Sequence, residues 1–406
     1  MTSTVNRIFL LLGIAAALVL PTHAAAESLL ICQLTGKGSA AGLAKKYGVT
    51  LKDTTDGAPF ALFSTPTRAM ADSVHALMAL DKVNFVWAED DGSVGCPEAQ
   101  SKSTPSKGGG LPAVGDRKAL QAINKNLLGQ INWSPALANL DGRSVRVAVL
   151  DNGLSPKQPA LWAKVDASLN AIEPGKPAYD QPMGVDSNKN GKKDEALGHG
   201  TMVAGIIDQI APKTRFVIAR IADSDGNASA WTLIKGLAFA VTQKAEVANV
   251  SLGSLAQVVA LTDAMDWCEQ NRLLVVAAIG NDGLRAACFP ARISKVVCVS
   301  GVDQDNHKAS FSNWEGTADA AAPATGFASQ FWDGSIAVWN GTSFAVPVVT
   351  ASIADCLRRI PANTPSTMRK ALTSSGTKID GLNPKYKGEL GMLVNYTKLD
   401  QALRKP

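Results

Sequence analysis

The sequence of this 406-residue chain predicts an α/β fold: a mostly parallel sheet that carries helices on both faces. A small α+β domain is expected to precede it. The first observation is that continuous apolar runs alternate with helical segments beyond residue 113. The second is a stretch at 92–112, rich in serine, proline and glycine, that separates this part from a compact N-terminal segment. A hydrophobic content of 46% is ample for the core of such a fold.

The composition excludes one class of partner. The formal net charge of +5 is spread over a chain in which only 18% of the residues are charged, and no long run of Lys or Arg occurs. A nucleic-acid-binding protein normally concentrates basic residues on one face or along one helix. No nucleic-acid partner is therefore expected.

Residues 1–26 have the organisation of a secretory signal peptide. Arg7 provides the basic start, residues 8–20 form an apolar run, and three alanines at 24–26 provide a cleavage pattern. A membrane anchor is the alternative, but it needs about 20 apolar residues, and Pro21 ends this run earlier. We expect a secreted or periplasmic protein with no membrane contact after removal of the signal peptide.

The six cysteines are even in number, and export would permit disulfides. Cys32 and Cys96 lie far upstream of the other four, so they are expected to pair with each other. Cys288 and Cys298 bracket a short loop and are the preferred second pair. Four cysteines allow three pairings, however, and the sequence leaves the other two pairings open.

The segment 27–91 alternates strand-like and helical stretches in the order β-α-β-β-α-β. This order predicts a small ferredoxin-like α+β domain. The polar stretch at 92–112 follows as a flexible linker and an accessible site for proteolysis. The expected strands are 28–34, 49–53, 59–64 and 83–88, and the expected helices are 39–47 and 67–80.

Residues 113–406 form the larger expected domain. Its strand-like segments are continuous and mainly apolar, which is typical of parallel strands buried on both faces. In such sheets the functional site lies in loops at the carboxyl ends of the strands. The expected strands are 145–150, 216–219, 247–252, 273–278 and 296–299, and the expected helices are 202–210, 230–241, 258–271 and 344–359.

An acid and a base stand at turns of this domain. Asp151 follows the strand 145–150 in an Asp-Asn-Gly turn. His199 lies between two glycines at a helix start, where it is approachable, whereas a core histidine would have bulky apolar neighbours. Each pattern is also explained by an ordinary turn or helix start. Among the four histidines, His199 is the best-placed base.

A serine and an amide complete the set. Ser343 opens a helix after a Gly-Thr turn, and Asn281 lies in the turn that follows 273–278. A serine at a helix start is often only a cap, because its hydroxyl is a poor nucleophile without a base. Together with Asp151 and His199, these residues can provide nucleophile, base, orienting acid and oxyanion donor.

These four motifs, in this order, resemble the subtilisin-like serine proteases. The resemblance covers roughly residues 120–400 and implies a subtilisin-like fold and a serine endopeptidase. It implies that Ser343 is the nucleophile and His199 the general base. It also implies that Asp151 orients His199 and that Asn281 is the oxyanion donor. The matching stretches are Asp151-Asn152-Gly153, His199-Gly200-Thr201, Asn281 and Gly341-Thr342-Ser343.

The resemblance extends to the substrate cleft and to the N-terminal segment. Ser251, Leu252 and Gly253 match the family's strand that pairs with an extended substrate, and Gly280 is assigned to the same cleft. The segment 27–91 is similar to the family's inhibitory propeptide. The implied partners are protein or peptide substrates and the chain's own propeptide. A monomer that needs no cofactor for its chemistry is expected.

Four neighbours of the site depart from the family pattern. Met202 stands where a second histidine is usual, and Asn152 where Thr or Ser is usual. Phe344 and Val346 stand where Met and Ala are commoner. None of these changes removes a group that transfers a proton or binds the oxyanion. The departures therefore bear on substrate preference rather than on activity.

A separate pattern occurs in the insertion that precedes the histidine. Asp186, Asn188, Asn190 and Asp194 carry oxygen ligands at the spacing of a calcium loop, with a glycine for the sharp turn. The position at which a bidentate Glu is expected is Leu197, and three lysines lie inside the segment. A Ca²⁺ site and a solvated polar loop are therefore equal alternatives.

Three functions are compatible with these features. The leading one is a secreted serine endopeptidase, made as a precursor and activated by cleavage of the propeptide. A catalytically silent secreted binding protein on a protease fold is the alternative, and it would be favoured by a missing catalytic group, but none is missing. A hydrolase of non-peptide esters would share the triad, although Ser343 lacks the G-x-S-x-G elbow.

Overall fold

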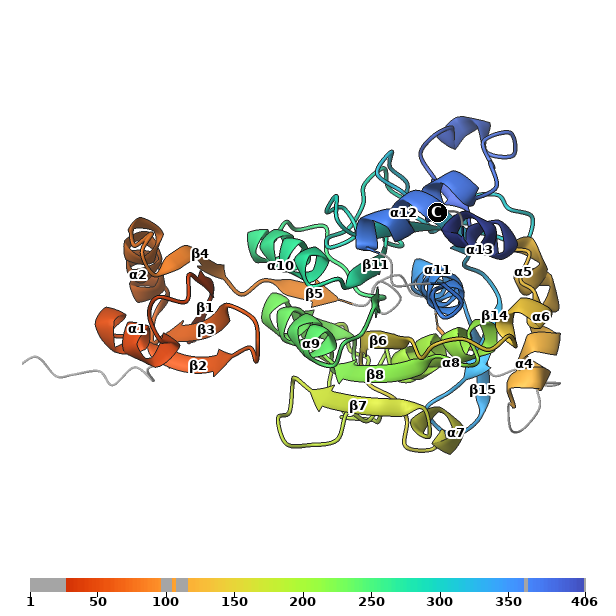
Figure 1. Ribbon diagram of the computed structural model, residues 1–406. Helices are drawn as coiled ribbons and strands as arrows, with labels where there is room; N and C mark the ends of the chain where they lie inside the picture. The colour runs from red at the N-terminus through yellow and green to blue at the C-terminus, as the bar shows by residue number, and fades with distance from the viewer. Residues whose placement is uncertain (1–26, 96–103, 107–115, 361–363, 405–406) are drawn as a thin grey trace, which may run out of the picture.

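The computed structural model describes residues 27–95, 104–106, 116–360 and 364–404. The expected signal peptide at 1–26, Cys96 and most of the expected linker lie outside these residues. Within the described part, no helix is long and apolar enough to span a membrane. A small N-terminal unit lies beside a larger unit that contains the long sheet (Figure 1).

The N-terminal unit is an antiparallel sheet with the strand order β2-β3-β1-β4. Side-chain caps begin its helices, because the hydroxyl oxygens of Ser39 and Thr67 accept hydrogen bonds from backbone amides of the first turn. The six elements follow the expected β-α-β-β-α-β order. They are β1 (Ser28–Leu34), α1 (Ala40–Tyr47), β2 (Thr50–Thr54), β3 (Phe60–Thr65), α2 (Arg68–Leu80) and β4 (Phe85–Asp90).

The two faces of this small sheet have different partners. On one face, Phe63 and Phe85 pack with α1 and α2 in a core of their own. On the other face, Ile31 and Phe60 join the buried cluster of the larger unit, and the Phe60 ring lies 6.2 Å from the Trp267 ring. The N-terminal unit is therefore held to the larger unit by apolar burial as well as by the connecting chain.

The larger unit is built on an eight-stranded sheet in the order β16-β13-β12-β11-β10-β6-β8-β7, and all neighbouring pairs are parallel. The predicted α/β fold with a mostly parallel sheet is confirmed. The strands are β6 (Arg146–Asp151), β7 (Val165–Asn170), β8 (Arg215–Arg220), β10 (Val247–Val250), β11 (Leu274–Ala278), β12 (Val297–Val302), β13 (Ala320–Pro323) and β16 (Met392–Leu393).

Helices cover both faces of this sheet. Val147 and Val149 of β6 face the cluster that contains α8 (His199–Ile210) and α11 (Thr342–Leu357). Ala148 and Leu150 face the cluster that contains α9 (Ala230–Thr242) and α10 (Val259–Gln270). Because successive side chains of a strand point to opposite faces, a continuous apolar run is what a doubly covered strand requires.

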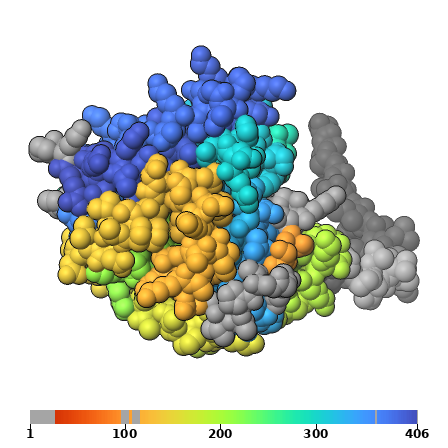
Figure 2. All heavy atoms as spheres, turned by 90° about the vertical axis from the view of Figure 1, so that its right-hand side faces the viewer, coloured from red at the N-terminus to blue at the C-terminus, as the bar shows by residue number. Residues whose placement is uncertain are grey.

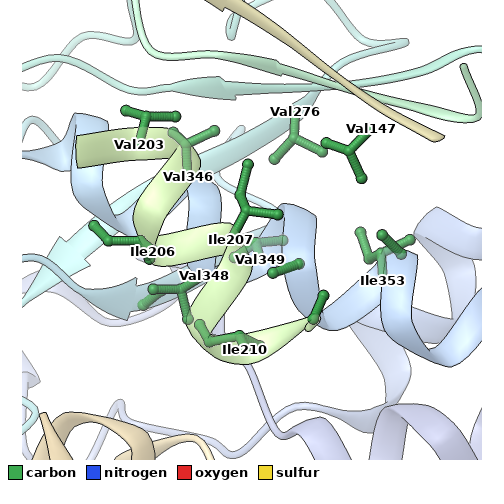
Figure 3. Packing of buried hydrophobic residues seen from close by; sticks show 14 of the residues in the cluster. Val147, Val203, Ile206, Ile207, Ile210, Val276, Val346, Val348, Val349 and Ile353 are labelled. Atoms are coloured by element: carbon green, nitrogen blue, oxygen red, sulfur yellow. The ribbon is translucent and has the colours of Figure 1, made fainter. Parts of the chain in front are cut away.

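The contact between α8 and α11 holds the two helices that begin at the predicted base and nucleophile. Figure 3 shows Val203 of α8 beside Val346 of α11, and Ile207 of α8 beside Val349 of α11. All four side chains are 0% exposed. Because protein interiors are close-packed, this contact fixes the position of α8 relative to α11.

Ile207→Ala is expected to lower the free energy of unfolding by about 2–5 kcal/mol, because it leaves a cavity in this contact. Denaturant unfolding in a Ser343→Ala background measures the change without self-digestion. Leu382→Ala is the matched control, because Leu382 is 50% exposed and should change stability by less than about 0.5 kcal/mol. Equal losses in the two variants would contradict the assigned core.

The C-terminal residues close the far side of the larger unit. Asp355 of α11 is fully buried and accepts hydrogen bonds from Arg358, Arg359 and Tyr396. Figure 2 shows α4, α5 and α6 as a gold surface beneath the blue C-terminal residues. These peripheral helices are α4 (Arg117–Ile123), α5 (Lys125–Gln130), α6 (Pro135–Ala138), α7 (Pro159–Trp162), α12 (Pro365–Ser375), α13 (Tyr396–Arg404) and the 3₁₀ turn at Pro384–Tyr386.

The preferred Cys288–Cys298 disulfide is not formed in the structure. All five described cysteines are buried free thiols, and Cys96, the expected partner of Cys32, lies outside the described residues. Cys298 is a residue of β12 and belongs to the core shared with α9 and α10, whereas the Cys288 side chain lies against Gly253 and Gly280.

Candidate active site

The Asp151–His199 pair forms where a strand ends and a helix begins. Asp151 is the last residue of β6 and His199 the first of α8, and both are buried. His199 Nδ1 lies 2.8 Å from Asp151 Oδ1, and the same oxygen accepts a hydrogen bond from the Asn152 amide. A carboxylate that accepts a hydrogen bond from Nδ1 leaves Nε2 as the proton-accepting nitrogen.

Asn152 ties this turn to the start of α8. Its Oδ1 accepts a hydrogen bond from the Gly200 amide at 2.9 Å, and its Nδ2 donates to the carbonyl oxygen of Ala196 at 2.6 Å. A Thr or Ser, which the family pattern has here, has a single oxygen on a shorter side chain, whereas the Asn amide uses separate donor and acceptor atoms for the two bonds. Asn152 is thus a bridge between the acid and the base.

Asp180 binds the same helix start from the insertion. Its Oδ1 accepts a hydrogen bond from the Gly198 amide at 3.0 Å, and its Oδ2 accepts one from Thr201 Oγ1 at 2.5 Å. Gly198, the cap residue of α8, has no side chain that could serve the first amides. Burial raises the pKa of Asp180 to about 7, although the bonds from Thr201 and Gly198 lower it.

Ser343 is the second residue of α11 and is fully buried. Its Oγ lies 3.0 Å from the carbonyl oxygen of Ser251, and Ser251 Oγ donates to the carbonyl oxygen of Ser343 at 2.8 Å. Pro347 has no amide hydrogen for that carbonyl, so the Ser251 hydroxyl takes its place while the helix continues through the proline. Two reciprocal hydrogen bonds therefore hold Ser343 to Ser251, in the segment that follows β10.

The orientation of the Asn281 side chain follows from its hydrogen bonds. Its Oδ1 accepts from the Thr342 amide at 2.9 Å and from Thr342 Oγ1 at 2.8 Å. Two donors on one atom identify that atom as the amide oxygen. The NH₂ group of Asn281 therefore points away from Thr342, and the amide of Ser343 is the next donor at the start of α11.

Aromatic rings surround the imidazole. The His199 ring centroid lies 5.8 Å from that of Trp339 in an edge-on arrangement and 5.4 Å from that of Phe344. Met202, which replaces the usual second histidine, is 0% exposed and belongs to the main core. Phe344 thus contributes a wall beside the base, whereas Met202 contributes packing under it.

The predicted substrate strand is paired in the structure, but with the chain itself. Gly253 donates to the carbonyl oxygen of Gly95 at 2.8 Å and accepts from the Gly95 amide at 3.1 Å. Gly95 ends β5 (Ser93–Gly95), which pairs on its other side with β9 (Asn227–Ser229). A strand therefore lies between the two walls of a cleft, within the range 92–112 that was expected to be linker.

The other predicted cleft residues lie beside this strand. Leu252 is 1% exposed and shares a cluster with Val94 of β5. Gly280 has φ +115°, and a Cβ there would lie 2.4 Å from Asn313 Nδ2 and 2.7 Å from Cys288 Sγ. Only glycine fits this backbone next to Asn281, because other side chains would be both strained and crowded.

The predicted metal residues are only partly brought together. Asp186 accepts hydrogen bonds from the amides of Asn190 and Gly191, so the loop folds around its carboxylate. Glu195 accepts hydrogen bonds from Nδ2 of Asn188 at 3.1 Å and from Nδ2 of Asn190.

Asp194, the fourth predicted ligand, faces another way. It accepts hydrogen bonds from Ser224 Oγ and from the Gly184 amide. Asp194 is therefore directed away from Asn188 and Asn190, whose amide groups donate to Glu195 instead.

Sequence reasoning missed two groups in this region. Asp180 stands within an irregular insertion, and no periodic pattern or turn signal connects it with α8. The strand β9 is only three residues long and carries no apolar run. Both are found only when the fold brings distant segments together, so a single sequence offers no signal for them.

Comparison with known proteins gives consistent matches. Residues 142–392 match the model of the subtilase family. Subtilisin BL of Lederbergia lenta is 32% identical over 261 residues, which cover 62% of this chain and 90% of that protein. Thermitase of Thermoactinomyces vulgaris is 29% identical over 252 residues, which cover 59% of this chain and 84% of that protein.

A solved structure agrees with these sequence matches. The crystal structure of a cold-adapted subtilisin-like serine proteinase matches this chain with a TM-score of 0.55 and 26% identity. The match covers 64% of this chain and 90% of that one. The range 142–392 includes each of the four predicted catalytic positions, Asp151, His199, Asn281 and Ser343.

Proposed function

Because this chain belongs to the subtilase family of serine endopeptidases, we propose that it hydrolyses peptide bonds through an acyl-enzyme formed on Ser343. The observation that carries this proposal is the 2.8 Å contact between His199 Nδ1 and Asp151 Oδ1 at the head of α8, with α11 packed against it. Subtilases need no cofactor for catalysis, so these side chains suffice for the chemistry.

The proposed reaction follows from the roles of the groups. His199 takes the proton of Ser343 as the Oγ–carbon bond forms, and then gives it to the leaving amine as the peptide C–N bond breaks. Asp151 keeps the imidazole in the required tautomer and stabilises its positive charge. The Asn281 amide and the Ser343 backbone N–H stabilise the oxyanion. In the second half of the reaction, His199 takes a proton from water as the water oxygen attacks the acyl carbon. His199 then returns the proton to Ser343 Oγ as the acyl–oxygen bond breaks and the carboxylic acid product leaves.

A fluorophosphonate probe tests this proposal directly. We expect one covalent adduct, located on Ser343 by mass spectrometry of the digested processed protein. His199→Gln should abolish labelling, because the hydroxyl then has no base. A probe adduct on another serine, or labelling that is unaffected by His199→Gln, would contradict the assignment and favour a silent binding protein.

We also propose that residues 27–91 are an inhibitory propeptide. Three kinds of contact support this role: β5 lies in the cleft, Glu89 accepts hydrogen bonds from the first amides of α10, and Asp91 accepts one from the Trp231 amide at the start of α9. Asp53 adds an ion pair with Lys235 at 2.5 Å. A substrate could pair with Gly253 only after β5 has left.

Secretion and the substrate class belong to the same proposal. The expected signal peptide at 1–26 would direct the precursor to the secreted or periplasmic fraction. There the enzyme would act on extended segments of other proteins, because pairing by strand addition recognises backbone.

Calcium at the insertion loop is a separate proposal. The oxygen atoms of Asp186, Asn188, Asn190 and Glu195 would hold the ion, which would stabilise the loop without taking part in the chemistry. Calorimetric titration of the uncleaved Ser343→Ala protein with Ca²⁺ is expected to give binding heat and a raised melting temperature. Asp186→Asn should remove both effects, and their absence in the parent protein would overturn the proposal.

A further inference from the structure

Part of the insertion that precedes His199, residues 178–180, lies against the turn that follows Asp151. Leu154 N donates to the carbonyl oxygen of Ala178 at 3.0 Å. Gly153 has φ +109°, and a Cβ there would lie 2.6 Å from the same carbonyl oxygen and 2.8 Å from the Asp180 amide nitrogen. This close approach is possible because glycine has no Cβ. The backbone of Asp180 is thus seated beside the turn that follows Asp151.

The side chain of Asp180 is directed at the start of α8. It is 1% exposed, and its oxygens accept from Gly198 N at 3.0 Å, from Thr201 Oγ1 at 2.5 Å and more weakly from Thr201 N at 3.4 Å. Thr201 Oγ1 in turn accepts a hydrogen bond from the Ser155 amide at 3.0 Å. The bonds therefore reach the residue before His199 and the residue two after it.

Resting on the peptidase function proposed above, we propose that Asp180 is a positioning residue for His199. Its carboxylate fixes the first turn of α8 against the Asp151 turn and places a negative charge at Gly198 and Thr201, on either side of His199 in the chain. It does not touch the substrate or the reacting atoms. Its expected effects are on the rate of proton transfer and on the pH range in which the base is available, rather than on substrate affinity.

The charges that act on Asp180 come from two elements. Asp151 lies on β6 and Arg220 on β8, and both side chains are buried. Arg220 is balanced in part by Glu173, whose carboxylate lies 3.8 Å from its guanidinium. The charge of Asp180 therefore acts within a small buried set and is little screened by solvent.

Asp180 changes charge in the range in which histidine does. Burial raises its pKa to about 7, the bonds from Thr201 and Gly198 lower it, and the charge of Asp151 adds to the rise. The carboxylate is thus formed as the solution passes through neutral pH, where a histidine of ordinary pKa loses its proton.

The first test does not require turnover. In a Ser343→Ala background, the ring protonation of His199 is followed by NMR across pH 4 to about 9, a range that brackets ordinary histidine titration. Asp180→Asn removes the charge and keeps an acceptor oxygen, so the midpoint of the His199 titration should fall by about one pH unit. Asp141→Asn, which removes an exposed carboxylate bound to Lys213, should leave the midpoint unchanged.

The second test uses the active enzyme. Asp180→Asn should shift the acid limb of kcat/KM to lower pH and reduce kcat about tenfold at the plateau with little change in KM. Thr201→Val removes one bond to the same carboxylate and should act in the same direction. The double variant should be less impaired than the two separate losses combined, because both act through one contact.

The outcomes separate this inference from the peptidase proposal. If Asp180→Asn lowers only the melting temperature and leaves the His199 midpoint and the pH profile unchanged, Asp180 is merely structural and the inference is wrong. If the parent enzyme shows no peptide hydrolysis but the midpoint shifts, the electrostatic contact is supported and the peptidase proposal is overturned.

Discussion

Ser343→Ala is expected to leave the precursor uncleaved and to reduce peptide turnover by about a millionfold, the size of loss that removal of the nucleophile causes in subtilisin. The physical reason is that the acyl-enzyme cannot form without the hydroxyl oxygen. N-terminal sequencing of the exported protein measures processing, and hydrolysis of a peptide substrate measures turnover. The parent protein should begin within 96–113, after the strand β5 that lies in the cleft.

Ser352→Ala is the matched control for this experiment. Ser352 is also a buried serine of α11, and its hydroxyl donates only to the carbonyl oxygen of Val348 among the bonds described. Its removal should permit normal processing and normal turnover. An intact precursor in the parent protein, in Ser343→Ala and in Ser352→Ala would count against self-cleavage.

Asp151→Asn is expected to reduce kcat by about ten-thousandfold, as the equivalent change does in a chymotrypsin-type triad. The 2.8 Å contact with His199 Nδ1 can be kept, but an amide that donates to Nδ1 holds the imidazole in the wrong tautomer. Nε2 then carries the proton and cannot accept one from Ser343. Substrate affinity should change little, because Asp151 is buried behind the histidine.

Steady-state kinetics on the processed Asp151→Asn protein measures this loss. If the variant does not process itself, addition of a trace of parent enzyme supplies the cleavage. Asp141→Asn, with its exposed carboxylate, serves as the control for removal of one charge. A loss below tenfold, or a loss confined to KM, would mean that Asp151 does not orient the base.

The fold was predictable where burial produces a recognisable hydrophobic pattern in the sequence. The strand β11 is apolar throughout, and β6 and β10 are mostly apolar, because both of their faces are covered. The strand β7 was missed because it lies at the sheet edge and its burial alternates along the strand. β16 was missed because two residues are too few to form a pattern.

The candidate site was predictable to a similar degree. Asp151, His199, Asn281 and Ser343 each stand beside a strand end or a helix start that has its own local signal. Asp180 has no such signal, because its role is created by a contact across the fold.

The calcium pattern was informative in part. The spacing of Asp186, Asn188 and Asn190 predicted a turn that does form around one carboxylate. The same spacing placed Asp194 in the set, whereas Glu195 is the acid that meets the two asparagines. A loop of this kind departs from the pattern when nearby groups, here Ser224 and the Gly184 amide, compete for one of its carboxylates.

The proline in α11 links the position of Ser343 to that of the neighbouring segment 251–253. Because Pro347 leaves the Ser343 carbonyl to the Ser251 hydroxyl, the segment 251–253 that we propose pairs with a substrate backbone also holds the proposed nucleophile. A displacement of that segment would be transmitted to the serine across a single pair of hydrogen bonds. A substrate that pairs fully with the segment 251–253 would therefore reduce the motion of Ser343. A substrate that pairs incompletely would leave Ser343 more mobile.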